Sequence, residues 1–558
     1  MLASVALVGC TNTDEPEVNN GNETQKGDAY VTVKLAMSGN TGSRAFSDGG
    51  FEEVESTSNE VKVNKAIFYF LDANNQGCAD KYTLGNVSNL AEWTESDGNN
   101  ASTDLTSQAV VVIKNPIATP ASIVCLINAD DPFTDNNRPS LAQIQAAVVD
   151  MSKANHTANG FMMTNSVYVD GTNVIVGAPI KAENIHKSDA DATVGNKDID
   201  TSAPVVIPVE RVVAKVKMQF DSSITNSTIK PTLSNNTNEY NITAEITGWW
   251  LASKANCSYL VKSLSASYAD FTDNWWNDKN NTRSYWANMP SNVEYTNSTT
   301  WAGANVTSAA EYCLENTSTV IDKTDQDGTG TATQYAARAI LKKDGEAITF
   351  VRYLNTIYTQ PDFFQLIADA YNSYRIKVEE GETVVTYDLN GQPMIQGKTA
   401  IATVLGWNYN GKNENENLGL ENYEGMVTVT APTTAGQSLV KVTTDAQGNE
   451  TYADVDAATI QNEIRTRIDK VLLWLNGQTY YYTDIIHNND GEAPLYGVVR
   501  NHLYTLNVKG LTGMGTPVPN PKLPINPERP ENDEYSHISA QVQILSYKVV
   551  PTQDVTLR

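Results

Sequence analysis

The segment that most constrains the fold is the last one, where a proline-rich stretch leads into an apolar strand. Residues 516–530 carry prolines at positions 517, 519, 521, 524, 527 and 530 and show no hydrophobic period. At this density the backbone favours extended polyproline II, at about 3.1 Å per residue, so the stretch spans roughly 40 Å. Such a tether separates the strand that follows it from the body of the chain.

The strand after the tether is half apolar. Between Ile538 and Ile544 every second residue is apolar, and the apolar phase then shifts by one residue at Leu545, which indicates a bulge or a two-faced strand. An apolar strand on a stiff tether is expected to insert into another molecule, and the alternative is an ordinary last strand of its own domain. The residues predicted to insert are Val542, Ile544, Leu545, Tyr547, Val549, Val555 and Leu557.

The other end of the chain has the pattern of a bacterial lipoprotein signal. Residues 2–9 form a short apolar run that ends at Cys10, and a polar stretch follows. This pattern predicts a lipid on Cys10, the alternative being a chance cysteine in a short leader. Only nine residues precede Cys10 and none is basic, so we expect the true start codon to lie upstream. No other stretch approaches the ~20 apolar residues of a membrane span, so attachment to a membrane is expected through lipid alone.

A second alternating strand follows this leader. Val31, Val33, Leu35 and Met37 share one face of a strand predicted over residues 30–37. The next segment, residues 38–45, is rich in small residues and contains Arg44, and loops of this composition are preferred sites of proteolytic cleavage. The chain therefore begins as it ends, with an apolar strand joined to the body by a segment that can separate from it.

Length and composition indicate a large, exposed β-protein. A chain of 558 residues holds at least two domains, and a net charge of −26 argues against binding to nucleic acid or to an anionic membrane. Many short β-rich runs and few helices favour two β-sandwiches, at residues 45–203 and 204–515, the second with insertions. Helices are predicted from Ser140 onward, over residues 361–374 and over residues 456–475.

The sequence offers little sign of catalysis. The five histidines are scattered, and four dispersed cysteines besides Cys10 do not demand disulfides. The turn at 325–328 (DQDG) resembles the middle of a calcium-binding loop but lacks the required ligands. We therefore expect no enzymatic activity, no metal and no cofactor. Trp249–Trp250 and the aromatic segment 275–301 allow a glycan-binding platform, but core packing and loop anchoring are the favoured interpretation.

Several segments, taken in order, resemble one known family. They are Cys10, Arg44–Ala45, residues 161–164 (FMMT), 210–216 (ERVVAKV), 312–317 (YCLENT) and, most specifically, 477–515 with 480–482 (YYY), 486–487 (IH) and 496–504 (YGVVRNHLY). Together they resemble the type V fimbrillins of Bacteroidales, the shaft subunits of surface fimbriae, and most of all the major subunit of the short fimbriae.

The resemblance implies a mainly β fold with two transthyretin-like β-sandwiches, a few short helices and an extended C-terminal donor strand, residues 516–558. It also implies export as an outer-membrane lipoprotein precursor and cleavage by an Arg-specific protease after Arg44. Residues 1–44 would then leave with their strand, and the chain would begin at Ala45. The tail of a neighbouring subunit would fill the vacated groove, building an open filament.

The leading hypothesis is therefore a self-polymerising shaft subunit that supports adhesion. It would assemble with itself and with anchor and tip subunits, and it would contact a host glycan or protein. The alternatives are an accessory or tip adhesin, and a lipid-anchored surface protein that binds glycans without polymerising.

Overall fold

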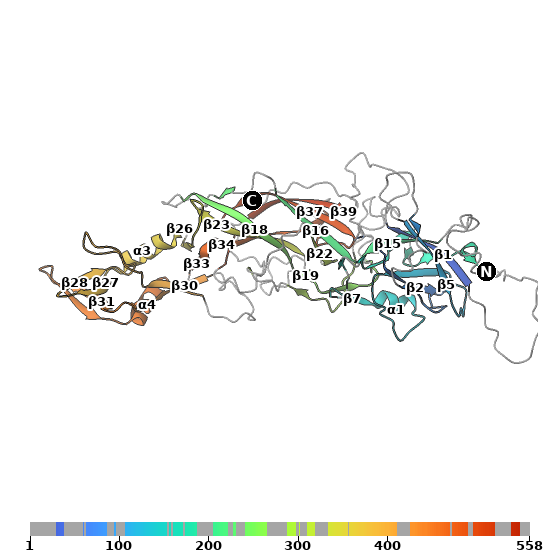
Figure 1. The fold of residues 1–558 in the computed structure, drawn as a ribbon, viewed down its shortest axis with the longest axis horizontal. Coiled ribbons are helices and arrows are strands. Elements are labelled where there is room, and N and C mark those ends of the chain that lie inside the picture. Colours follow the sequence, from blue (N-terminus) through green and yellow to red (C-terminus); the bar gives the residue numbers. More distant parts are fainter. Residues whose placement is uncertain are drawn as a thin grey trace, which may run out of the picture.

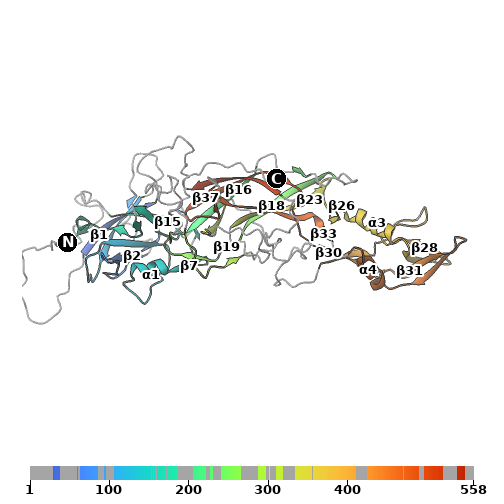
Figure 2. The ribbon, with the colours of Figure 1, turned by 180° about the vertical axis from the view of Figure 1, so that it is seen from behind.

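The structure is a computed structural model of the chain. It describes residues 29–37, 60, 63–85, 94–95, 106–152, 154, 156–157, 160–170, 173–186, 205–220, 227–229, 240–264, 287–296, 301, 310–317, 333–354, 356–409, 424–468, 471–488, 495–518 and 537–546. The described parts are mainly β-strand, as predicted, and follow one another along an elongated molecule (Figures 1 and 2). We call them the N-terminal domain, the middle domain and the distal lobe.

The N-terminal domain is built on a ten-stranded sheet with the main order β3-β2-β6-β10-β15-β1-β5-β4, in which β13 pairs with β6 and β14 with β1. Its strands are β1 (Ala29–Met37), β2 (Lys65–Leu71), β3 (Tyr82–Gly85), β4 (Thr94–Glu95), β5 (Thr106–Ile113), β6 (Ser122–Ile127), β10 (Met163–Asn165), β13 (Ala178–Pro179), β14 (Ile185–His186) and β15 (Val205–Arg211). Smaller elements beside it are β7 (Val148–Asp150), β8 (His156–Thr157), β9 (Gly160–Phe161), β11 (Tyr168–Asp170), β12 (Asn173–Ile175) and the 3₁₀ helix η2 (Ala182–Asn184).

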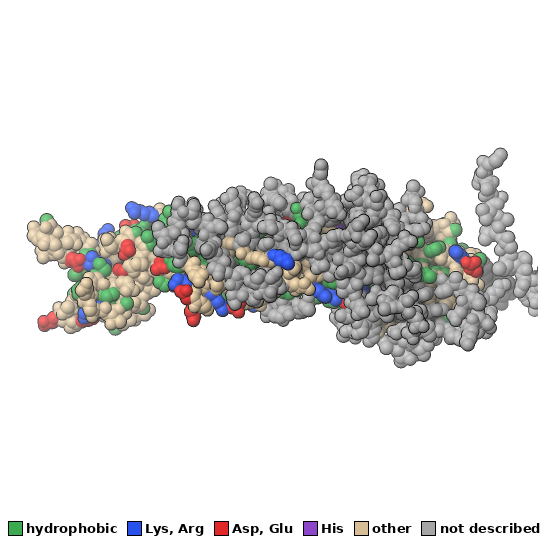
Figure 3. Space-filling model, turned by 90° about the horizontal axis from the view of Figure 1, so that it is seen from above, with side chains coloured by type: hydrophobic (Ala, Val, Ile, Leu, Met, Phe, Trp, Pro, Cys, Tyr) green, Lys and Arg blue, Asp and Glu red, His purple; other side chains and the backbone are tan. Residues whose placement is uncertain are grey.

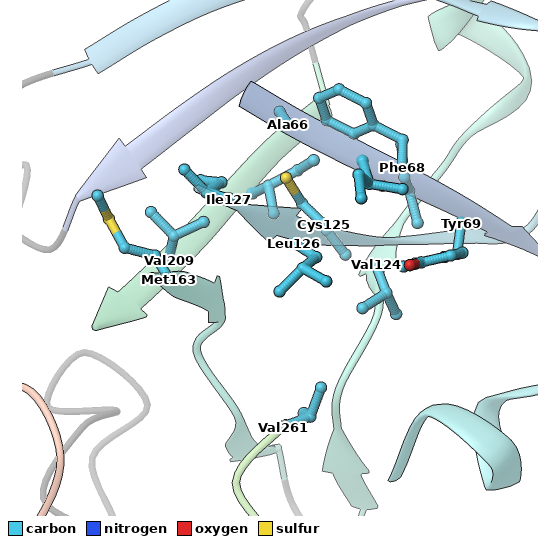
Figure 4. Close-up of a cluster of buried hydrophobic side chains, with 14 of the residues drawn as sticks. Ala66, Phe68, Tyr69, Val124, Cys125, Leu126, Ile127, Met163, Val209 and Val261 are labelled. Carbon is cyan, nitrogen blue, oxygen red and sulfur yellow. The ribbon is translucent and has the colours of Figure 1, made fainter. Parts of the chain in front are cut away.

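The core of this domain lies around β2 and β6. Both strands are nearly continuous apolar runs, which is typical of strands covered on both faces, and their residues after the first are all buried. Figure 4 shows side chains of these strands gathered with Met163 and Val209. Asn165 connects the strands because its side chain accepts a hydrogen bond from Cys125 N (2.7 Å) and donates one to the carbonyl of Ile123 (3.0 Å).

The predicted helix after Ser140 is present as α1 (Leu141–Ala146). The Ser140 hydroxyl accepts a hydrogen bond from Gln143 N, and Gln143 Oε1 accepts one from Ser140 N, so the two residues form a capping box. Ile144 is the buried residue of this helix.

The middle domain packs two sheets against each other. The first has the order β22-β16-β37-β39, with β16 (Val213–Phe220), β22 (Glu311–Leu314), β37 (His502–Thr512) and β39 (His537–Ser546). The second has the order β17-β18-β23-β34-β38, with β17 (Ser227–Ile229), β18 (Ile242–Ala252), β23 (Gln334–Lys343), β34 (Gln478–Asp484), β38 (Thr516–Pro517) and, beside β23, β24 (Glu346–Ala347).

Short elements connect the middle domain to its surroundings. They are β19 (Lys254–Ala255), β20 (Cys257–Tyr259), β21 (Tyr295–Thr296), β35 (Ile486–Asn488), β36 (Leu495–Tyr496) and the 3₁₀ helix η6 (Leu475–Gly477). Among them, β20 pairs with β7, so a strand ladder joins the middle and N-terminal domains.

The distal lobe is formed by the chain between β24 and η6, and it lies at the opposite end of the molecule from β1 (Figure 1). One sheet contains β25 (Phe350–Tyr353), β26 (Thr356–Thr359), β29 (Leu405–Tyr409), β30 (Glu424–Val429) and β33 (Val471–Trp474). The other contains β27 (Tyr374–Glu380), β28 (Thr383–Tyr387), β31 (Gln437–Thr444) and β32 (Glu450–Asp454), and two helices complete the lobe, α3 (Gln360–Ala370) and α4 (Ala457–Arg465).

This lobe has its own hydrophobic core, separate from that of the middle domain. The distal lobe, which the sequence does not separate from the second sandwich, is thus a folded unit. The helix predicted over 456–475 is wrong in its second half, because α4 ends at Arg465 and Val471–Trp474 is strand β33. Leu472 continues the i+4 spacing of Ile460 and Ile464, but its strand neighbours Val471 and Leu473 are the buried residues there.

Candidate functional site

The predicted leader strand β1 lies in the interior of the N-terminal sheet. On one side it runs antiparallel to β5, in a register that extends from Ala29 opposite Ile113 to Ala36 opposite Thr106. On the other side it pairs with β14 and then runs parallel to β15, from Val33 opposite Val205 to Met37 opposite Val209. A strand with ladders on both edges cannot leave without opening the sheet.

The side chains of β1 belong to the domain core. Val31 and Val33 are 0% exposed and Leu35 is 1% exposed, and all three pack in the hydrophobic cluster around β2 and β6. Full burial of such a side chain contributes about 1.5–3 kcal/mol. The Thr32 hydroxyl is also buried, and it has no hydrogen-bond partner among the described residues. We call the space that β1 occupies between β5 and β15 the slot.

The tail strand β39 has a different position. It runs antiparallel to β37, from His502 opposite Ser546 to Thr512 opposite His537, and it ends the order of its four-stranded sheet. Among the described strands it therefore has a single partner, the situation in which a strand is available for pairing elsewhere. The one register shift lies on β37 between Val508 and Gly510.

The outcome for the predicted tail is mixed. In the full chain β39 pairs with its own middle domain, which is the alternative of an ordinary last strand, and β1 fills the slot. Of the two alternatives for the shift of apolar phase near Ile544, the bulge is not found, because the register with β37 runs without a shift from Ala540 to Ser546, and the two-faced strand stays a prediction. Insertion of Val542, Ile544 and Leu545 into another molecule stays a prediction.

Other predicted sites fall outside the described residues. They are Cys10, Arg44, Ala45, Tyr547, Val549, Val555 and Leu557. The segments 187–202 and 318–332, including the calcium-loop-like turn, also lie outside them, as do Trp275, Trp276 and Trp286.

A buried polar cluster joins the end of β15 to the middle domain. The carboxylate of Glu60, which is 0% exposed, accepts hydrogen bonds from Lys215 Nζ on β16 and Tyr312 Oη on β22, both at 2.5 Å. The main-chain oxygen of Glu60 accepts a hydrogen bond from Arg211 Nε at 2.8 Å. Arg211 Nη1 in turn donates to Asn501 Oδ1 at 2.9 Å, and Asn501 directly precedes β37.

Two further ion pairs lie beside this cluster. Arg500 binds the carboxylate of Glu315 through Nε at 2.7 Å and donates through Nη1 to the carbonyl of Leu260 at 3.0 Å. Lys262 Nζ lies 3.2 Å from Glu210 Oε2, with both side chains fully buried. Burial raises the pKa of Glu210 and lowers the pKa of Lys262, because it disfavours the charged form of each. We call these ion pairs and the Glu60 cluster the junction.

The junction brings together segments that the sequence singles out separately. Residues 210–216, 312–317 and 496–504 meet there, although they are far apart along the chain. Glu60 and Lys262 were not anticipated, because a single charged residue carries no sequence signal of burial. The histidines of the family-like segments serve packing: His487 Nδ1 lies 2.7 Å from Tyr504 Oη, and His502 Nδ1 lies 2.8 Å from the carbonyl of Arg500.

The described tryptophans of the aromatic region are structural. Trp249 and Trp250 are each 3% exposed, on opposite faces of β18. Trp301 is buried as well, donates from Nε1 to the carbonyl of Thr479 at 2.9 Å, and is covered by the Arg338 guanidinium, 4.8 Å from the ring centroid. Core packing therefore accounts for these three rings.

Three further observations concern the described residues alone. They contain no group of three or more side chains arranged to hold a metal ion, and no helix long and apolar enough to cross a membrane. The cysteines at positions 78, 125, 257 and 313 are all free and buried. The surface of the distal lobe mixes apolar, acidic and basic side chains (Figure 3).

Comparison with solved structures finds several bacterial proteins of similar length. A putative cell adhesion protein from Bacteroides eggerthii is 10% identical, with 94% of this chain and 97% of that one covered at a TM-score of 0.34. One from Parabacteroides distasonis is 11% identical, with 92% and 99% covered at 0.34. The tip fimbrial protein Mfa3 from Porphyromonas gingivalis is 10% identical, with 92% and 99% covered at 0.31. No curated protein matches the sequence.

A family model gives the more direct result. Residues 473–552 match the model described as "Major fimbrial subunit protein type IV, Fimbrillin, C-terminal". This range begins in β33 and contains β34, β37 and β39, so it covers Arg500 and Asn501 of the junction and the tail strand. Over this C-terminal region the chain is similar to the fimbrillins.

Proposed function

We propose that the protein is a structural shaft subunit of a cell-surface fimbria, polymerising by protease-triggered donor-strand exchange and supporting adhesion. The match to fimbrillins supports the fimbrial role and the location at the cell surface. The observation that carries the finer proposal is the contrast between the chain's two terminal strands. β1 fills an interior position of the N-terminal sheet, whereas β39 lies at the edge of the middle domain.

Removal of β1 creates an acceptor. Once the strand is gone, β5 and β15 face each other across the width of one strand, with unpaired backbone groups on both edges. Val111 on β5 and Ile207 on β15 are buried while β1 is in place, and they would line this opening once β1 is gone. A strand that re-forms both ladders and fills the space of Val31, Val33 and Leu35 restores the core.

Detachment of β39 creates a donor. The chain is fixed to the middle domain as far as Val518, because β38 pairs with β34 and Val518 N donates to the carbonyl of Gln478 at 3.2 Å. Beyond that point residues 519–536, if extended, reach roughly 55 Å. The tail strand can therefore leave β37 and enter the slot of a second subunit while its own domain stays folded. Donor and acceptor surfaces differ, so the contact propagates as an open filament.

The remaining steps concern processing. The precursor is exported and lipidated on Cys10, and an Arg-specific protease cuts between Arg44 and Ala45. That cut separates β1 from the body of the chain, because Arg44 lies between Met37 and the buried Glu60. Until the cut is made, β1 occupies the slot and blocks assembly. Anchor and tip subunits, and a host glycan or protein, are the further partners of this proposal.

Two variants test the proposal, one at the cleavage site and one in the donor strand. Arg44→Ala should give a folded precursor that stays monomeric, because β1 cannot leave. Deletion of residues 540–558 should also stop elongation, because the donor is lost while the domains still fold. Fibre growth is followed by electron microscopy and size-exclusion chromatography after protease treatment. Fibres that form at normal rates from either variant contradict the proposal.

A control and one measurement separate the alternatives. Replacing residues 42–45 with the recognition sequence of a different protease should restore assembly only when that protease is added. Amino-terminal sequencing of the surface-purified protein should find Ala45. A lipid-blocked Cys10 would instead identify the anchored glycan-binding protein, and an Ala45 terminus on a chain that never elongates alone would identify an accessory or tip subunit.

A further inference from the structure

Glu60 occupies an unusual place for a glutamate. It is fully buried, and it follows β1 and the predicted cleavage site along the chain. Its carboxylate is held by Lys215 and Tyr312 of the middle domain, and its main-chain oxygen by Arg211 of β15. A buried carboxylate is tolerated only when it is paired and hydrogen-bonded, and here two donors satisfy one oxygen at 2.5 Å.

The position of Glu60 relative to β1 gives it a second role. Met37, the last residue of β1, pairs with Val209 of β15, and Glu60 binds Arg211 two residues further along the same strand. The segment that contains the predicted cleavage site therefore starts and ends beside the same end of β15. Before this segment the chain is attached to β15 by the ladder between β1 and β15. After this segment it is attached to β15 by the hydrogen bond between Glu60 and Arg211.

β15, one of the two strands that flank the slot, loses much of its backbone pairing when β1 leaves. Its pairing from Val205 to Val209 is with β1, and its remaining ladder is the short antiparallel one with β10, from Met163 opposite Arg211 to Asn165 opposite Val209. Beyond this ladder, the end of β15 is held by the contacts of Arg211 with Glu60 and Asn501 and by the buried ion pair of Glu210 with Lys262. These contacts do not involve β1 and so remain after cleavage.

We propose that Glu60 is a positioning residue for the acceptor site: it holds the end of β15 against the middle domain after β1 has left, so that the slot keeps the width of one strand. This proposal rests on the proposed function and deepens it. The proposed role concerns the acceptor, because the hydrogen bonds described for Glu60 go to β15, β16 and β22, whereas the donor strand β39 pairs with β37.

The test measures acceptor function alone. The full chain is cleaved at Arg44, the leader is removed by size-exclusion chromatography, and a fluorescent synthetic peptide of residues 537–558 is titrated while its anisotropy is recorded. Glu60→Gln keeps the shape of the side chain but loses its charge, which leaves Lys215 unpaired. We expect about tenfold weaker peptide binding, or a greater loss, because removing one partner of a buried ion pair is costly.

A matched control comes from the same region. Glu311 on β22 forms an ion pair with Lys254 at 2.8 Å and accepts a hydrogen bond from Leu251 N, and none of these residues belongs to β15. Glu311→Gln should leave peptide affinity within about twofold of the wild type, since affinity responds only to groups that shape the slot. The uncleaved Glu60→Gln chain should also keep wild-type circular dichroism, because β1 then braces β15.

Each outcome supports or refutes either the proposed function or the role of Glu60. If the wild-type cleaved chain does not bind the peptide, the proposed function fails. If the wild type binds and Glu60→Gln binds equally well, the role of Glu60 is refuted while strand exchange stands. If uncleaved Glu60→Gln is already unfolded, Glu60 serves folding in general and the proposal is also refuted. Glu60→Gln subunits should still add to wild-type fibre ends through their tails and then stop further growth.

Discussion

The first and the last strand of this chain are both alternating apolar segments, yet the fold treats them differently. β1 has ladders on both edges and buries Val31 and Val33 completely, whereas β39 has a single ladder and lies at the edge of its sheet. The difference shows that sequence alternation does not decide how firmly a strand is held. The number of neighbouring strands decides how firmly a strand is held. β1, with two neighbours, is hard to remove, whereas β39, with one, can detach and pair with another subunit.

The largest expected effect is on the strand with two neighbours. Val33→Asp places a carboxylate in the N-terminal core, and we expect a loss of about 4 kcal/mol or more in the free energy of unfolding of that domain. Val542→Asp in β39 is the matched change, and it should cost the precursor about 1 kcal/mol, because an edge strand can detach locally. Chemical denaturation of the two precursors measures both values. Equal losses in the free energy of unfolding would show that the two strands are held equally firmly.

A smaller effect is expected at Thr32, a poorly matched position of β1. Thr32→Val removes a buried hydroxyl that has no hydrogen-bond partner among the described residues, and should stabilise the precursor by about 1 kcal/mol. The same change should slow replacement of β1 by the tail peptide after cleavage. Thr32→Ser, which keeps the hydroxyl, is the control. A destabilised Thr32→Val chain would mean that the hydroxyl is satisfied in solution.

The smallest effect compares two buried thiols. Burial raises the pKa of the Cys313 thiol to about 12, and burial likewise raises that of Cys125, so at pH 8 neither should react with iodoacetamide in the precursor. Removal of β1 opens the core that contains Cys125 but leaves the middle domain intact. Labelling should therefore rise severalfold at Cys125 and not at Cys313, as measured by mass spectrometry, and rise further with pH. Equal labelling would show that both domains open together.

Much of the local structure could be predicted from the sequence because it depends on neighbouring residues. The strand at residues 30–37, the Ser140 cap and the burial of Trp249 and Trp250 follow from periodicity and composition. The distal lobe was not anticipated as a unit with its own core, since an insertion shows its elements but not their packing.

The junction could not be predicted for a different reason. Its ion pairs join residues such as Lys215 and Glu60, or Arg500 and Glu315, whose separations along the chain are 155 and 185 residues. No local pattern marks either partner as buried. The family-like segments pointed to the right strands, but not to the charges between them.

The near-continuous passage from β15 into β16 has a mechanical consequence. The two strands are separated by Val212 alone, the first runs parallel to β1 and the second runs parallel to β37. Tension applied along such strands loads many ladder hydrogen bonds at once, in shear, instead of unzipping them singly. A fibre joined through these strands would resist the drag of flowing fluid without any covalent link between its subunits.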